Sequence, residues 1–486
     1  MDNLFKTLGE LKSSKYKSKT IKDELRDNLI HNISNNINVF ETVHGFDSTV
    51  IPQLESAILS GHNINFLGLR GQAKTRLARL MVNLLDEYIP IIEGSELNDD
   101  PFNPITAYAK NLITKHGDDT PITWLHRSDR FSEKLATPDV TIADLIGDVD
   151  PIKAATLKLT YADDRVIHYG MVPRSNRCIF VINEIPDLQA RIQVALFNIL
   201  QEGDVQIRGF KLRLDLDLQF IFTANPEDYT NRGSIVTPLK DRIGSQIITH
   251  YPNDIEIAKL ITAQEVALKG SQKIGIQVPE LAKSLIEQIN FEARNSPYVD
   301  EKSGVSARLS ISAYQNLVST AELRLIKSND KDTVVRMSDF FGVVPAITGK
   351  IELVYEGEQE GAESVVKQLV TNAVKTLFPN YFPNIEKLEK EEDESPYDGI
   401  INWFFENEGF EILDHISNED YNTLLNSVRP LNDLIENYQP KLPDFEINFM
   451  KEFILWGLVQ SNKLTQKRFN KGIQIQDPFG SFIRKL

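Results

Sequence analysis

The segment from residue 64 to residue 88 constrains the fold more than any other part of the chain. An apolar run, INFLGL (64–69), leads into the Gly-rich turn GLRGQAKTR (68–76), and Leu and Met residues at helical spacing follow it. This order is a strand, then a Gly-rich turn that ends in Lys-Thr, then a helix. In such an arrangement, the backbone N–H groups of the turn and the N-terminus of the helix can face bound phosphates. The segment therefore predicts a phosphate-binding loop.

Within this loop, the residue types indicate separate tasks. We expect Lys74 to contact the β- and γ-phosphates of a nucleotide and the Thr75 hydroxyl to bind Mg²⁺. The strict G-x-x-x-x-G-K-[ST] pattern has Gly where this chain has Ala73. Because Ala is the smallest residue with a Cβ, we expect it to be tolerated, provided that the position does not need a positive φ. The remaining predicted binding residues of the loop are Gly68, Gly71 and Gln72.

A second motif follows about 100 residues later, where the apolar run CIFVI (178–182) ends in Asn183 and Glu184. Phosphate-loop ATPases use an acidic residue here to hold the Mg²⁺ shell and a residue that positions the attacking water. We therefore predict Glu184 as the general base. Asn183 can accept a hydrogen bond from a Mg²⁺-bound water but contributes no negative charge, so we expect weaker magnesium binding and slower turnover.

Three more polar residues follow in order along the chain. Asn225 stands at the end of the apolar run LQFIFTA (218–224), where its amide could reach the γ-phosphate or the attacking water. Arg242 lies in PLKDRIG, and Arg308 opens a predicted helix after GVSA. A lone arginine is a weak signal, so the prediction for both depends on their position after the first two motifs.

The apolar runs also predict the architecture. The runs at 64–69, 178–182, 218–224 and 246–251 alternate with amphipathic stretches, which predicts a parallel sheet with crossover helices. Their continuous apolar character indicates strands buried on both faces. In the segment LKLTYADDRVIHY (157–169), two alternating runs around an Asp-rich turn predict a β-hairpin. Along the chain we predict a helical arm at 1–45, an α/β nucleotide domain at 46–252 with a β-hairpin insert near 137–177, a helical lid at 253–380 and a helical segment at 381–486.

Taken together, these motifs resemble those of AAA+ ATPases, in the branch of the MoxR proteins and the magnesium-chelatase I subunit. GQAKT is similar to the phosphate loop of that group, INEIPDLQARIQVALFNILQEGDVQIRG to its Walker B region and FTANPEDY to its sensor-1 strand. PLKDRIG is similar to its arginine-finger helix and GVSAR to its sensor-2 motif. The resemblance covers residues 40–350. It implies an AAA+ P-loop NTPase domain followed by a helical lid.

The resemblance also implies cofactors, roles and partners. ATP and Mg²⁺ would bind at Lys74 and Thr75, and Asn225 would act as sensor 1. Arg242 would reach the nucleotide of a neighbouring subunit, and Arg308 would read the nucleotide from the lid. An arginine supplied in trans requires a homo-oligomer, and we expect a hexameric ring. The family further implies a client or partner protein, such as one with a von Willebrand A-type domain.

Charge and cysteine content exclude other classes. The 486 residues carry a net charge of −16, so nucleic acid is not an expected partner. The single cysteine, Cys178, excludes an intramolecular disulfide and is typical of the reducing cytoplasm. No apolar run reaches the about 18–20 residues of a membrane span. We therefore expect a cytoplasmic protein without membrane insertion.

Three alternatives to a client-remodelling ATPase stay open at this point. One is the motor subunit of a magnesium chelatase, which would need partner subunits to contact a porphyrin. Another is a scaffold that binds ATP but hydrolyses it weakly, because Asn183 replaces an acid. The third, a transcriptional activator, is disfavoured because no DNA-binding module is recognisable in the sequence.

Overall fold

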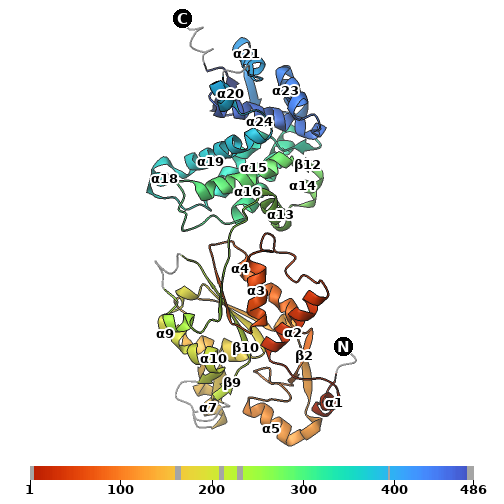
Figure 1. The fold of residues 1–486 in the computed structure, drawn as a ribbon, viewed down its shortest axis with the longest axis vertical. Coiled ribbons are helices and arrows are strands. Elements are labelled where there is room, and N and C mark those ends of the chain that lie inside the picture. The colour runs from red at the N-terminus through yellow and green to blue at the C-terminus, as the bar shows by residue number, and fades with distance from the viewer. Residues whose placement is uncertain (1–4, 159–165, 207–212, 227–233, 392–394, 479–486) are drawn as a thin grey trace. The chain divides into compact units, whose positions relative to one another are not determined.

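The computed structural model describes residues 5–158, 166–206, 213–226, 234–391 and 395–478 (Figure 1). The chain divides into two compact units, Met1–His250 and Tyr251–Leu486. The first unit contains the predicted parallel strands, and the second is mainly helical. Among the described residues, none of the helices combines the length and the apolar character needed to cross a bilayer.

A five-stranded sheet forms the centre of the first unit. All four pairs of neighbouring strands are parallel, so the carboxyl ends of the strands meet at one edge. The predicted α/β fold class with a parallel sheet is therefore confirmed. Four strands coincide with the predicted apolar runs, whereas the edge strand FSEKL is an addition of the structure. The strand order is β11 (Ser245–Ile248), β1 (Ile64–Leu67), β10 (Leu218–Ala224), β7 (Cys178–Asn183) and β4 (Phe131–Leu135).

The sheet is buried on both faces, which explains the continuous apolar runs. Successive side chains of a strand point to opposite faces, and in β7 Ile179 and Val181 belong to one core while Phe180 belongs to the other. Figure 1 shows the two groups of helices on opposite sides of β10. The core that contains Ile179 and Val181 also includes side chains of α2 (Ile21–Ser34), α3 (Val50–Leu59) and α4 (Lys74–Leu80). The core that contains Phe180 includes side chains of α9 (Ala190–Ala195) and α10 (Phe197–Glu202).

A buried ion pair joins the N-terminal helix α2 to the sheet. The side chains of Glu24 and Arg130 are 4% and 1% exposed, and two hydrogen bonds of 2.6 and 2.7 Å connect them. Arg130 directly precedes β4 and also donates to the carbonyl of Arg177. The N–H of Ile21 donates to Asp217, whose pKa burial raises to about 6. The predicted helical arm, which contains α1 (Leu8–Ser13) and α2, therefore packs as part of the first unit.

The region of the predicted hairpin insert differs in detail from the expectation. β6 (Ile167–Tyr169) pairs antiparallel with β5 (Gly147–Val149). Leu157 instead ends the helix α7 (Pro151–Leu157). Asp150 caps this helix by accepting two backbone N–H bonds, and Pro151 suits its first position, which explains why the helix forms here. Residues 159–165, which include the expected turn, lie outside the described residues.

The second unit is built on helices around one hydrophobic core that runs from Ile276 to Ile475. The helical C-terminal segment is present, and the structure adds a three-stranded antiparallel sheet to it. The strand order of this sheet is β14 (Phe410–Leu413), β16 (Gly472–Gln476) and β15 (Thr465–Phe469). The main helices are α13 (Ile255–Glu265), α15 (Glu280–Asn295), α16 (Arg308–Ser328), α19 (Ala362–Leu377), α21 (Asp398–Glu406), α22 (Asn418–Ser427), α23 (Pro430–Tyr438) and α24 (Ile447–Gln460).

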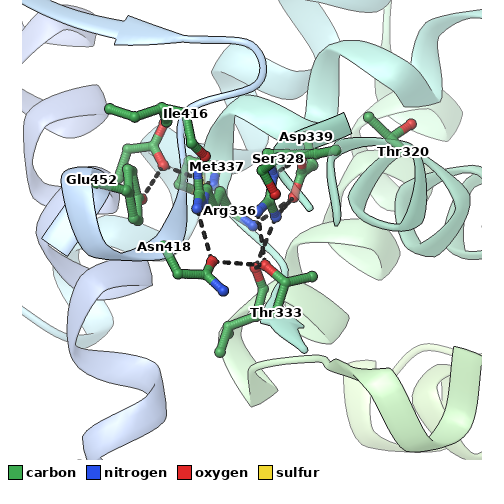
Figure 2. Close-up of polar contacts among 12 residues, drawn as sticks. Thr320, Ser328, Thr333, Arg336, Met337, Asp339, Ile416, Asn418 and Glu452 are labelled. Carbon is green, nitrogen blue, oxygen red and sulfur yellow. Dashed lines mark hydrogen bonds and ion pairs between the residues drawn. The ribbon is translucent and has the colours of Figure 1, made fainter. Parts of the chain in front are cut away.

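A buried polar network ties the C-terminal segment into this core (Figure 2). Arg336 donates to the carbonyl of Ile416 at 3.1 Å and to the amide oxygen of Asn418 at 2.9 Å. Glu452 on α24 accepts from the backbone of Met337 and from the Tyr421 hydroxyl. Burial raises the pKa of Glu452 to about 7. Because Arg336 and Glu452 are buried, each depends on its partners to remain inside the core.

Candidate functional site

The predicted site residues that belong to the phosphate loop, to β7 and to the end of β10 meet at the carboxyl edge of the parallel sheet. Leu67, the last residue of β1, is paired with Ala224, the last residue of β10. The N–H of Gly68 donates to the carbonyl of Ala224 at 3.1 Å, which places the start of the loop beside Asn225. β7 lies on the other side of β10 and ends at Asn183, so its polar residues reach the same edge.

The first loop residue has to be glycine for a reason that the structure makes explicit. The hydroxyl of Thr249 donates to the side-chain oxygen of Gln72 at 2.8 Å. A Cβ at Gly68 would collide with both of these oxygen atoms. Gln72 is itself buried, and this hydrogen bond holds the turn of the loop against the residue that follows β11. Gly68 and Gln72 thus shape the loop, and their predicted part in nucleotide binding stays a prediction.

The condition attached to the expectation for Ala73 is not met, because the backbone at this position has a positive φ. Gly71 has a φ of +72° and Ala73 a φ of +55°. For a residue with a Cβ, the left-handed region costs roughly 1–2 kcal/mol. This explains the glycine in the strict pattern. The chain accepts Ala73 at this cost, with the side chain packed partly buried against the core that includes α4.

Lys74 provides a buried cation inside the loop. It is 8% exposed, and its ammonium donates to the carbonyls of Gly68 and Leu69 and, at 2.7 Å, to the amide oxygen of Asn225. These three acceptors are uncharged oxygens, whereas a lysine in such a loop is suited to bind phosphate oxygens as a point charge. The ammonium is therefore held within the turn of the loop and beside Asn225, and the chemistry of the loop fits the phosphates of a nucleotide.

Asn225 connects this cation to the predicted general base. Its amide oxygen accepts from Lys74, and its amide nitrogen donates to a carboxylate oxygen of Glu184 at 2.7 Å. Glu184 follows directly after β7 with a φ of +56°. Its backbone N–H donates to the hydroxyl of Thr223 at 3.1 Å. The arrangement holds a carboxylate on the nucleotide side of the sheet, where it could accept a proton from water.

Asn183 faces the predicted magnesium position. Its amide oxygen accepts from the Thr223 hydroxyl at 3.1 Å and lies 3.5 Å from the Thr75 hydroxyl. Its amide nitrogen donates to Glu133 on β4 at 2.7 Å. Hydroxyl, amide and carboxylate oxygens are the ligand types that Mg²⁺ prefers. Among the described residues, no group of three or more His, Cys, Asp or Glu side chains could hold a metal alone. The Thr75 hydroxyl and the Asn183 amide oxygen fit a magnesium ion that nucleotide phosphates and water help to bind.

The structure places the two arginines differently. Arg242 follows α12 (Thr237–Lys240), donates to the side-chain oxygen of Gln201 at 2.8 and 3.0 Å, and lies over the ring of Phe197. These contacts hold it on α10, rather than in the hydrogen-bonded group around Lys74. Arg308 is exposed at the start of α16 in the second unit. The predicted roles of both arginines stay predictions.

The sequence reasoning missed three residues of the site: Thr223, Thr249 and Glu133. Thr223 lies inside a predicted strand, where its hydroxyl joins Asn183 to the backbone of Glu184. Thr249 directly follows β11. Glu133 belongs to the strand that was not predicted, because the residues of FSEKL are only partly buried and two of them are charged. FSEKL has apolar residues only at its two ends, so no apolar periodicity indicated this strand.

Comparison with known proteins adds only partial likenesses. No family model matches the chain, and no curated protein matches it. A protein of Cytophaga hutchinsonii described as an ATPase is 20% identical, with 74% of this chain and 97% of that chain covered and a TM-score of 0.29. The complex of BchI and BchD of magnesium chelatase is 17% identical, with 66% and 98% covered and a TM-score of 0.36. Closed-state Hsp104 is 13% identical, with 69% and 52% covered and a TM-score of 0.37. Similarities this low carry no weight beyond the geometry of the site.

Proposed function

We propose that the chain is a Mg-ATP-dependent ATPase of the AAA+ class, in the branch of the MoxR proteins and the magnesium-chelatase I subunit. The observation that supports this most is the hydrogen-bonded series Lys74–Asn225–Glu184 at the carboxyl edge of the sheet. It joins a buried cation suited to phosphate with a carboxylate suited to a water molecule. The resemblance of the ordered motifs points to the same activity.

Each residue of the series has a distinct task in this proposal. Bound Mg²⁺ would neutralise charge on the phosphates of ATP during phosphoryl transfer. Lys74 binds phosphate oxygens, and the backbone of the loop surrounds them. Glu184 orients the attacking water and accepts its proton. Asn225 holds both the Lys74 ammonium and the Glu184 carboxylate, so a change in the phosphates would move the base.

The active form in this proposal is a homo-oligomeric ring, a hexamer, in the cytoplasm. Arg242 would leave Gln201 and reach the nucleotide of the adjacent subunit, and Arg308 would contact the nucleotide from the second unit. An arginine supplied in trans raises hydrolysis by about 10³–10⁵-fold. The resulting cycle would remodel or activate a partner protein, for which a von Willebrand A-type domain protein is a candidate.

ATP turnover with Mg²⁺, measured over a range of protein concentrations, tests this proposal. We expect the rate per subunit to rise with concentration, because catalysis needs a neighbour. Glu184→Gln should abolish turnover at every concentration while ATP still binds. Arg242→Ala should remove the dependence on concentration and leave only the slow basal rate. A chain that fails to bind ATP with or without Mg²⁺ would contradict the proposal.

A second function is favoured by one observation, the amide of Asn183 opposite Thr75. If this amide cannot support the Mg²⁺ shell, the chain would bind ATP as a nucleotide-gated scaffold and scarcely hydrolyse it. The same assay separates the two functions. Tight ATP binding with turnover no faster than that of Glu184→Gln would indicate the scaffold.

A further inference from the structure

The replacement of an acid by Asn183 removes one negative charge from the predicted magnesium site, yet a carboxylate lies directly beside the amide. We propose that Glu133, on the neighbouring strand β4, supplies the negative charge that Asn183 lacks and positions its amide oxygen toward the magnesium ion of the bound nucleotide. This inference rests on the proposed function and concerns the same site. It assigns a role in metal binding to a residue outside both sequence motifs.

The register of the sheet brings Glu133 to Asn183. β4 runs parallel to β7, with Glu133 opposite Val181 and Leu135 opposite Asn183. From two positions earlier, the longer Glu133 side chain reaches toward the carboxyl edge, and its Oε1 accepts from Asn183 Nδ2 at 2.7 Å. Arg79 on α4 contacts the other carboxylate oxygen at 2.8 and 3.2 Å. Glu133 is therefore held from both sides, with its side chain 26% exposed.

This contact fixes which way the amide of Asn183 points. Because the amide nitrogen donates to Glu133, the amide oxygen has to face the opposite side, where the hydroxyls of Thr75 and Thr223 lie. That oxygen is the only atom of the Asn183 amide that can bind a metal ion or accept from a metal-bound water. Glu133 thus acts on Asn183 as outer-shell carboxylates act on metal ligands in other sites.

The two residues are also complementary in charge. An Asp at position 183 would bring a second carboxylate to the place where Asn183 now donates to Glu133, and like charges would repel. Positions 183 and 133 together carry one negative charge, as an Asp beside a neutral residue would, and Arg79 partly offsets that charge on the outer side of Glu133. The charge has moved from β7 to β4. We therefore expect the effect of a substitution at one position to depend on the residue at the other.

Mg²⁺-dependent binding of a fluorescent ATP analogue tests this inference without measuring hydrolysis. All variants are made in the full-length Glu184→Gln background, and Mg²⁺ is titrated from an EDTA baseline. Glu133→Gln should raise the Mg²⁺ concentration at half-saturation about 10–100-fold. Its affinity for the analogue in EDTA should stay unchanged. When Asn183→Asp is added to Glu133→Gln, the new amide on β4 can donate to the new carboxylate on β7. The Mg²⁺ concentration at half-saturation should then return to within about threefold of that of the starting protein.

Two controls keep a structural effect apart from the proposed one. Arg79→Gln removes the ion pair on the outer side of Glu133 but leaves its contact with Asn183, so the Mg²⁺ requirement should stay within about threefold. If Glu133→Gln does not fold, Glu133→Asp serves instead: it keeps the charge but is one methylene shorter, so its contact with Asn183 should weaken and the Mg²⁺ requirement should rise, by less than for Glu133→Gln.

Distinct results would overturn the inference. A Glu133→Gln protein with an unchanged Mg²⁺ requirement would exclude the role of Glu133 while leaving ATP binding intact. If Glu133→Gln raises the Mg²⁺ requirement equally whether residue 183 is Asn or Asp, its effect is merely structural. If the starting protein binds the analogue neither in EDTA nor with Mg²⁺, the proposed function fails, and the inference fails with it.

Discussion

The ion pair between Glu24 and Arg130 predicts that helix α2 contributes strongly to the stability of the first unit. The perturbation is Glu24→Gln, which keeps the shape and removes the charge. Both side chains are at most 4% exposed, so the guanidinium of Arg130 would stay buried with only the carbonyl of Arg177 and a neutral amide as partners. Breaking a buried pair by removing one partner costs about 3–5 kcal/mol. We expect a loss of free energy of unfolding in this range.

The distribution of tryptophans allows the first unit to be observed alone. Trp124 is the only tryptophan of that unit, and the chain's two others, Trp403 and Trp456, lie in the second unit. With both of these replaced by Phe, fluorescence during urea unfolding reports on residues around Trp124. For a urea slope of about 3 kcal/mol/M, Glu24→Gln should lower the unfolding midpoint by about 1 M or more.

An exposed ion pair of similar length provides the matched control. Lys12 and Asp118 are 2.7 Å apart, and their side chains are 50% and 70% exposed. Water and salt screen such a pair, so Asp118→Asn should change the free energy of unfolding by less than about 1 kcal/mol. Equal, small effects of Glu24→Gln and Asp118→Asn would refute the reasoning, because burial would then add nothing to the strength of the pair.

Two further predictions concern the second unit and the loop. Burial raises the pKa of Glu452 from its ordinary 4.5 to about 7, so its contribution to stability is full below pH 4.5 and is lost as the pH rises through 7. Glu452→Gln should flatten this decline, as thermal unfolding followed at pH 5 and pH 8 would reveal, whereas an unchanged decline would point to other groups. Gly68→Ala should abolish binding of a fluorescent ATP analogue, because its Cβ would collide with Thr249 and Gln72. Unimpaired binding by a folded Gly68→Ala protein would contradict this account of the loop.

The sequence predicted the centre of the first unit because that part has the simplest physical signal. Strands buried on both faces favour apolar side chains at most positions, and INFLGL, CIFVI and LQFIFTA are mostly apolar. The polar residues that follow the strands then had to meet at one edge, as Asn183, Glu184 and Asn225 do. The fold and the proximity of these side chains depend on the same parallel strands, whereas their roles stay predictions.

Strands with mixed or alternating side chains were missed. The edge strand β4 has no fully buried side chain, and β15 in the second unit reads TQKRF, with most of its residues exposed or half-buried. Such segments carry little apolar periodicity, so propensity alone does not separate them from loops. The positive φ of Ala73 was missed for a different reason, since a single backbone angle leaves no trace in the residue type unless that residue is glycine.

Asn183 appears to remove a negative charge only when the residues of its own strand, β7, are considered alone. A motif is a property of the chain, whereas a metal shell is a property of the edge where several strands end. In a parallel sheet, the side chains of β4 and β7 reach the same edge, so a carboxylate on either strand can serve the same position. A substitution that looks deleterious within the motif can therefore be offset by a residue 50 positions earlier in the sequence. If Glu133 has this role, the polar residue after the second strand and the acid on its neighbour need to be considered as one unit, and weak hydrolysis cannot be deduced from Asn183 alone.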